Sequence, residues 1–167
     1  AQPRVRAADS DPQTVPTVDL ERYQGTWHEI GSIPQWFSRG CTATTATYTL
    51  RGDGTVAVLN ECHLVSPKGP LIKAEGIARS VDQTNAKLLV SFHSFAGLPM
   101  GDTGNDGDYW ILALADDYSS VMIGTPARDA LWILSRQPKL AADVTAAYLA
   151  QAEGDGFPVD RVKWTKQ

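Results

Sequence analysis

Eight short segments of alternating apolar and polar residues, separated by turn residues, constrain the fold of this chain more than any other feature. A Gly-Asp-Gly turn at 52–54 joins two of them, which is a strong hairpin signal. Segments of this length at fairly regular spacing are typical of an antiparallel sandwich or barrel. The segments are 26–32, 42–51, 55–64, 71–81, 86–95, 109–115, 120–125 and 130–136.

Closure of the sheet is favoured because eight antiparallel strands would otherwise leave two exposed edges. A closed eight-stranded barrel can hold one small ligand. Ala74, Gly76 and Ala78 alternate along one predicted strand. Facing inward, they would leave a cavity; facing outward, they would let a helix approach. A fully packed interior is the alternative.

The region after the last strand predicts one amphipathic helix at about 138–153. Pro138 stands near its start and Gly154 just past its end, while Leu140, Val144, Tyr148 and Ala152 recur every four residues. A short closing strand is expected at about 159–165. Residues 1–17 are polar and Pro-rich and lack the apolar stretch of a signal peptide, so they are expected to form a flexible arm before a single domain at 18–167, with its barrel at about 25–136.

Composition and motifs exclude several function classes. The net charge of -4 and pI of about 5.3 provide no basic stripe for nucleic acid, and no apolar window approaches the length of a membrane span. There is no Ser nucleophile elbow, no Walker loop and no His-Glu-x-x-His motif. His28, His63 and His93 lie on different predicted strands without metal-like spacing, so no metal or cofactor is expected. A single histidine can ligate haem, which keeps a haem carrier as an alternative.

Two stretches resemble the lipocalin family. "VDLERYQGTWHEI" (18–30) carries the Gly-x-Trp opening of that family, and "ALADDYSSVMIGTPARDALWILSR" (113–136) resembles its second and third conserved blocks. The best match is to bacterial outer-membrane lipocalins and apolipoprotein D-like proteins. The resemblance implies an all-β, eight-stranded antiparallel up-and-down barrel with one C-terminal helix outside, and a carrier of apolar small molecules. It also implies a structural pair in which Arg136 lies over Trp27.

The resemblance places the first inter-strand loop over the open mouth of the barrel. Trp36 and Phe37 in that loop would cover the cavity or touch a membrane surface; alternatively, they pack the loop onto the rim. In the long segment 96–108, Leu98 and Met100 are expected to fold over bound ligand, unless the segment is a solvated insertion. The side chains expected to face the ligand are Tyr48, Val56, Val58, Asn60, Gly76, Leu88, Val90, Phe92, Trp110, Leu112 and Leu114. One bulge in a strand would reverse which of its side chains face inward.

The two cysteines, Cys41 and Cys62, suit either one disulfide in an oxidising compartment or two buried thiols in a cytosolic one. In a hairpin that pairs Arg51 with Gly54, the cysteines become diagonal neighbours, close enough for a small adjustment to bridge them. With the setting that the resemblance implies, we expect the disulfide.

The expected function is extracytoplasmic binding and transport of a small hydrophobic ligand, such as a fatty acid, a lysophospholipid or a related lipid or pigment. The expected location is periplasmic or secreted, with outer-membrane association and peripheral membrane contact as further candidates. The rival is a lipocalin-type isomerase or de-epoxidase that acts on a lipid-like substrate. Glu29 shares a face with Trp27 and would either select a cationic or hydroxylated ligand or serve as a structural acid. Ligand identity and oligomeric state stay open.

Overall fold

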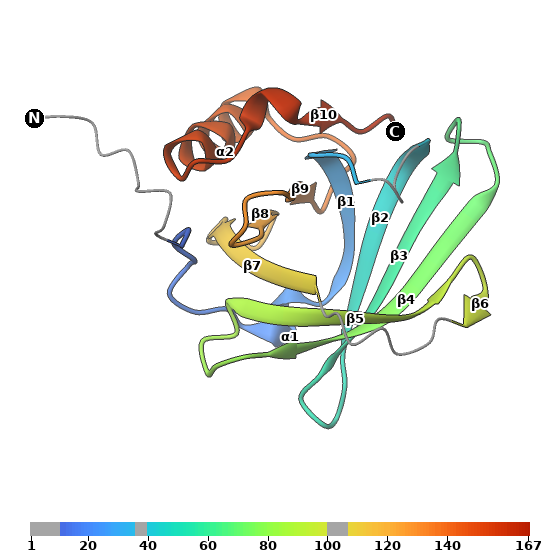
Figure 1. Ribbon diagram of the computed structural model, residues 1–167, viewed down its shortest axis with the longest axis horizontal. Coiled ribbons are helices and arrows are strands. Elements are labelled where there is room, and N and C mark those ends of the chain that lie inside the picture. The colour runs from blue at the N-terminus through green and yellow to red at the C-terminus, as the bar shows by residue number, and fades with distance from the viewer. Residues whose placement is uncertain (1–10, 36–39, 100–106) are drawn as a thin grey trace, which may run out of the picture.

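The computed structural model describes residues 11–35, 40–99 and 107–167. Its strands curve around a common interior and the long helix lies outside them (Figure 1). No helix among the described residues is long and apolar enough to span a bilayer. In chain order the elements are α1 (Leu20–Tyr23), β1 (Gly25–Ser32), β2 (Cys41–Leu50), β3 (Val56–Leu64), β4 (Leu71–Ser80), β5 (Lys87–Phe95), β6 (Leu98–Pro99), β7 (Gly107–Leu114), β8 (Ser120–Gly124), β9 (Leu131–Ser135), α2 (Ala142–Gly154), a 3-10 turn (Val159–Arg161) and β10 (Lys163–Trp164).

Strand β1 closes the sheet, because it pairs with β2 on one side and β9 on the other. The neighbours follow the order β1, β2, β3, β4, β5, β7, β8, β9, and each pair is antiparallel. Strands β6 and β10 add only two residues each. The structure therefore confirms the closed eight-stranded antiparallel barrel and all eight predicted strands.

One end of the barrel, here called the floor, is covered by α1 and the residues before it. Asp19 caps α1 by accepting hydrogen bonds from the amides of Glu21 and Arg22. Val15 and Val18 donate backbone hydrogen bonds across the floor and pack against the interior. Of the predicted arm, residues 11–17 are described, and within them Val15 packs against the barrel end; the flexibility of the arm stays a prediction.

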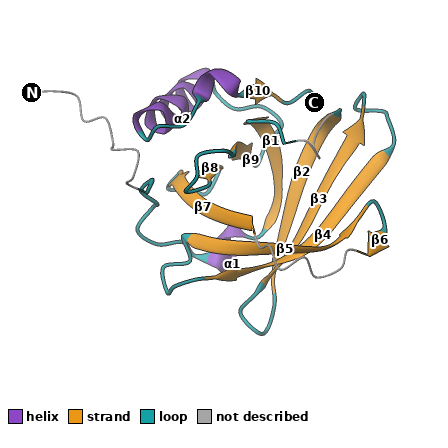
Figure 2. Cartoon of the chain, viewed as in Figure 1, coloured by secondary structure: helices purple, strands orange, loops and turns teal. Residues whose placement is uncertain are grey.

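Two apolar clusters divide the core. The first fills the barrel interior, and its fully buried centre includes Trp27, Ile111 and Val121. The second lies between the outer face of β7–β9 and α2, where Tyr148 and Ala152 of the helix are buried. Figure 2 shows the long helix α2 outside the barrel. Strands β7, β8 and β9 are consequently covered on both faces, unlike β2–β4.

Helix α2 begins at Ala142 rather than near Pro138, and it includes Gly154. The predicted start was therefore four residues early: Ala141 occupies the N-cap and makes no side-chain capping bond, so no residue there signals the boundary. The predicted closing strand is reduced to β10 after a 3-10 turn. Its continuation lies between β1 and β2, since the Thr165 amide donates to Ile30 O and the Ala43 amide donates to Lys166 O.

The disulfide between Cys41 and Cys62 is present, with a Cα–Cα distance of 5.3 Å. The Gly54 amide donates to Arg51 O and the Arg51 amide donates to Thr55 O, and the ladder beyond pairs Leu50 with Val56, one residue from the expected register. A register shift between Thr42 and Thr45 compensates and places Cys41 opposite Leu64. Cys62 is thus two residues from the partner of Cys41, which is the predicted diagonal relation.

Candidate ligand-binding site

The interior wall of the barrel comes mainly from β2, β3, β4 and β5. Cross-strand pairing of Tyr48 with Val58 and of Val58 with Gly76 shows that these strands expose the same face inward. Six residues of this face were expected to line the interior and are buried. They are Tyr48, Val56, Val58, Gly76, Leu88 and Val90. Their role in binding ligand stays a prediction.

Gly76 does not leave open space, because a side chain occupies it. A Cβ at position 76 would meet Ser91 O at 2.7 Å and the Phe92 ring at 3.0 Å. Phe92 is partly buried against the interior cluster. The small residues of β4 therefore admit the ring of a neighbouring strand rather than a helix from outside.

Trp110 and Leu112 lie on the outer face of β7, so the prediction that they face the interior was wrong. Both belong to the cluster beneath α2, and Lys87 Nζ lies 4.3 Å from the centre of the Trp110 ring. Tyr109 and Ile111 face inward instead. A register shift between Ile111 and Ala113 then returns Leu114 to the interior. The alternation of apolar and polar residues could not show which side chains of β7 face inward, because this strand is apolar on both faces.

Three tyrosines, which the site prediction did not place together, meet at the floor. Tyr23 comes from α1, Tyr48 from β2 and Tyr109 from β7. The Tyr23 and Tyr109 hydroxyl oxygens are 2.6 Å apart, and Tyr109 donates to Tyr48 at 2.9 Å. A small cavity of about 10 Å³ adjoins them, with Leu20, Val56, Val58, Ala78, Leu88 and Val90 as its other walls. Only Tyr48 was expected to line the site; starting the β7 alternation at Tyr109 would have found a second.

Trp27 and Arg136 form the pair implied by the resemblance. Arg136 Cζ lies 3.8 Å from the centre of the Trp27 ring, and Trp27 is fully buried. The guanidinium also donates to the carbonyls of Arg22 and Tyr118, while the indole N–H donates to Tyr23 O. The pair therefore joins α1 to the last barrel strand beneath the tyrosines.

Glu29 belongs to the interior side of β1, where it pairs with Leu134 of the interior cluster. Its Oε2 accepts a hydrogen bond from Thr165 Oγ1 at 2.5 Å. Burial raises the pKa of the Glu29 carboxyl, although hydrogen bonds from Thr165 and Ser32 act in the opposite direction. The carboxyl is thus a partnered group that fastens the C-terminal segment to β1.

A Glu29→Gln variant should gain stability relative to the parent as the pH rises. Burial raises the folded-state pKa of Glu29 above its unfolded value, so its stabilising contribution is full below the unfolded pKa, about 4.3, and is lost as the pH rises through the folded pKa. Urea unfolding near pH 4 and near pH 8 measures the difference. Glu153→Gln, on the exposed side of α2, controls for the change in net charge. A difference that stays constant with pH would contradict this account.

Two polar groups lie higher on the interior wall. Asn60 is half-buried and pairs with Ala46 and Ala74. Thr44 lies in the irregular stretch of β2, and its Oγ1 is the one buried side-chain polar atom without a hydrogen-bond partner in the described part of the chain. A bound molecule could satisfy either group.

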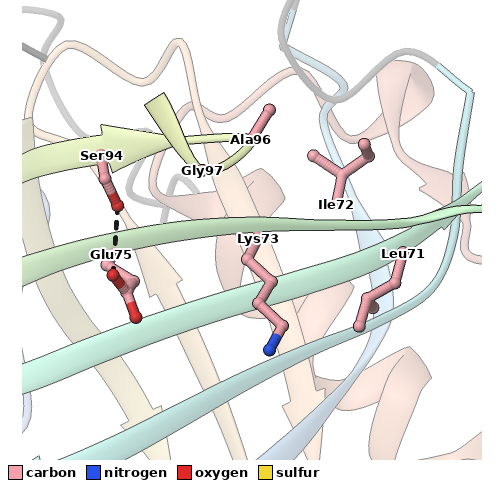
Figure 3. Close-up of a pocket in the computed structure, with 7 residues that line it drawn as sticks. All are labelled: Leu71, Ile72, Lys73, Glu75, Ser94, Ala96 and Gly97. Atoms are coloured by element: carbon pink, nitrogen blue, oxygen red, sulfur yellow. Dashed lines mark hydrogen bonds between the residues drawn. The ribbon is translucent and has the colours of Figure 1, made fainter. Parts of the chain in front are cut away.

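A second cavity, of about 280 Å³, lies beside the β5–β6 turn, and most of its lining is polar or faces away from the interior (Figure 3). Ser94 Oγ donates to Glu75 Oε2 at 3.2 Å across it. Lys73 and Ile72 point to opposite sides of β4 (Figure 3). Its charged residues make it a poor match for an apolar ligand.

Of the residues expected to cover the ligand, only one is among the described residues. Leu98 is on β6 and 70% exposed. Trp36, Phe37 and Met100 lie outside the described residues. Phe95, which the site prediction omitted, pairs with Ala74 on the interior face, because a register shift between Glu75 and Gly76 moves it there.

The fold and the apolar interior define a closed β-barrel of the small-ligand-binding class. The family model described as "Lipocalin-like domain" matches residues 18–167, and the chain belongs to the lipocalin family. Membership implies binding of a small hydrophobic ligand, without identifying it.

The curated relatives agree with this assignment. The chain is 36% identical to temperature-induced lipocalin-1 of Arabidopsis thaliana, over 93% of this chain and 82% of the relative. It is 38% identical to outer membrane lipoprotein Blc of Citrobacter freundii, over 89% and 79%. It is 34% identical to apolipoprotein D of Rattus norvegicus, over 78% and 67%.

Among solved structures, insecticyanin from the tobacco hornworm Manduca sexta aligns with a TM-score of 0.70. The alignment covers 95% of this chain and 85% of that chain at 19% identity. At this identity, the likeness concerns the fold alone.

Proposed function

We propose that this protein binds and carries a small hydrophobic ligand, such as a fatty acid, a lysophospholipid or a related lipid or pigment, inside the barrel. The main support for this proposal is the inward face of β2–β5, where apolar side chains surround the cavity at the floor. Burial of apolar ligand surface there would supply about 25 cal/mol per Å². The floor cavity has room for about one water molecule, so only the tip of a ligand could enter it, and the rest would lie above it and displace Phe92.

An extracytoplasmic location is part of this proposal. Disulfides persist in oxidising compartments, and the cysteines here are bridged. Several relatives are named outer membrane lipoproteins. Both observations support a periplasmic or secreted carrier, and the first applies without reference to any relative.

A binding role is favoured over the enzymatic and haem alternatives. Both cysteines of the chain are bridged, so neither is available as the thiolate of a cysteine-dependent isomerase. His28 stands between the inward-facing Trp27 and Glu29 on β1, the His63 ring contacts Gly69 O at 3.0 Å, and His93 is exposed. The positions of the three histidines thus argue against an interior haem ligand.

An Asn60→Trp variant should bind a fluorescent fatty-acid probe about tenfold more weakly than the parent, because the indole would fill the interior above the floor. Leu59→Trp is the matched control, since the neighbouring side chain faces the other side of β3. Probe titration and native mass spectrometry of co-purifying molecules measure binding. Loss of affinity in both variants alike, or no binding by the parent, would contradict the proposal.

A further inference from the structure

The three tyrosine hydroxyls at the floor form a linear chain of two hydrogen bonds, so one of their three protons has no acceptor within the chain. Each hydroxyl carries one proton. The Tyr109 proton is donated to Tyr48, so the Tyr23 proton must be the one shared with Tyr109. The Tyr48 proton then has no acceptor among the described residues. A buried donor without a partner costs about 1–3 kcal/mol, so the site is built for an acceptor that this chain does not supply.

The surroundings of this free O–H determine what can meet it. Tyr48 is 6% exposed, and the walls of the adjoining cavity other than the tyrosines are aliphatic. Burial raises the pKa of Tyr48 to about 12 and that of Tyr23 and Tyr109 well above 10, so all three phenols stay neutral donors at ordinary pH. Arg136, whose charge acts on Tyr23, is turned toward the Trp27 ring and backbone carbonyls.

We propose that the Tyr48 hydroxyl is a hydrogen-bond subsite for an uncharged acceptor, such as a ketone, aldehyde or ester carbonyl, at the inserted end of the ligand. This rests on the proposed function, because it concerns the deep end of a molecule bound in the barrel. A carboxylate fits poorly there, since a charge without a cation in an apolar site is strongly disfavoured. A ligand whose inserted end is purely hydrocarbon would leave the Tyr48 hydroxyl without an acceptor.

The test compares two probes that differ only at the tip: a long-chain methyl ketone and its isostere in which a methylidene group replaces the carbonyl oxygen. The ratio of ketone affinity to isostere affinity should be about 2- to 10-fold higher in the parent than in Tyr48→Phe, the range expected for one neutral hydrogen bond. The ketone carbonyl stretch should also move to lower frequency on binding. Tyr48→Phe keeps the ring and leaves the hydration of the two probes unchanged, so it should lower only this ratio and should abolish the frequency shift.

Tyr23→Phe is the matched control, because it removes a hydroxyl of the same chain but not the free proton of Tyr48. It should retain the parent's ratio of ketone affinity to isostere affinity. Thermal melting verifies that each variant is folded. If the parent binds neither probe, the proposed function fails. If Tyr48→Phe gives the same affinity ratio as the parent, as when a retained water occupies the cavity, the subsite is overturned while the binding function stands.

Discussion

Replacement of Trp27 by alanine should lower the free energy of unfolding by about 3–5 kcal/mol, the usual cost of removing a large buried aromatic side chain. Trp27 is fully buried, and its ring lies between Tyr23, at a centroid distance of 5.2 Å, and the guanidinium of Arg136. The variant would leave a cavity beneath the tyrosines and remove the cation–π contact. Urea unfolding of parent and variant gives the difference.

Trp164→Ala is the matched control, because the same side chain is lost from a position that is 55% exposed. Trp164 of β10 lies against Gly31 and is largely exposed, so its loss should cost far less. The affinity for ligand per folded molecule should remain nearly constant in Trp27→Ala. A variant that unfolds like the parent but no longer binds would assign Trp27 to the ligand site instead of the scaffold.

The strands were predictable because β1–β5 separate an apolar interior face from a more polar exterior. Turn residues then marked their ends, as with Gly54, whose φ of 86° suits glycine in the hairpin after β2. Helix α2 was predictable as an element but not at its start, since Ala141 carries no capping side chain. The sequence thus predicts the end of a helix or strand where the residue at that end is one that a turn or a helix cap requires.

Which side chains of each strand face the interior was less predictable. It depends on bulges that are not visible in the alternation of apolar and polar residues. Register shifts after Glu75 and after Ile111 change which side chains face inward. On β7 both faces are apolar, since α2 covers the outside, so Trp110 and Tyr109 were equally plausible choices. The bond between Glu29 and Thr165 joins residues at opposite ends of the chain, and only the closed barrel brings them together.

Loss of the disulfide should cost about 3 kcal/mol, the second large effect that we expect. Cys41 and Cys62 are 21 residues apart, and a bridge over a loop of this length restricts the unfolded chain by about that amount in the chain-entropy model. The bond joins the first residue of β2 to β3, next to the irregular stretch where the C-terminal segment meets Ala43. A double Cys41→Ser, Cys62→Ser variant should therefore unfold at lower urea concentration than the parent.

The chain contains its own control for this prediction, because it has no cysteine besides these two. Reductant should lower the unfolding midpoint of the parent toward that of the double-serine variant, and it should not change the midpoint of the variant itself. The intact mass of the parent should rise by two hydrogens on reduction. If reductant left the parent's midpoint unchanged although the mass showed complete reduction, the bond would contribute nothing to stability. The β2–β3 ladder and the C-terminal segment would then hold this side of the barrel without it.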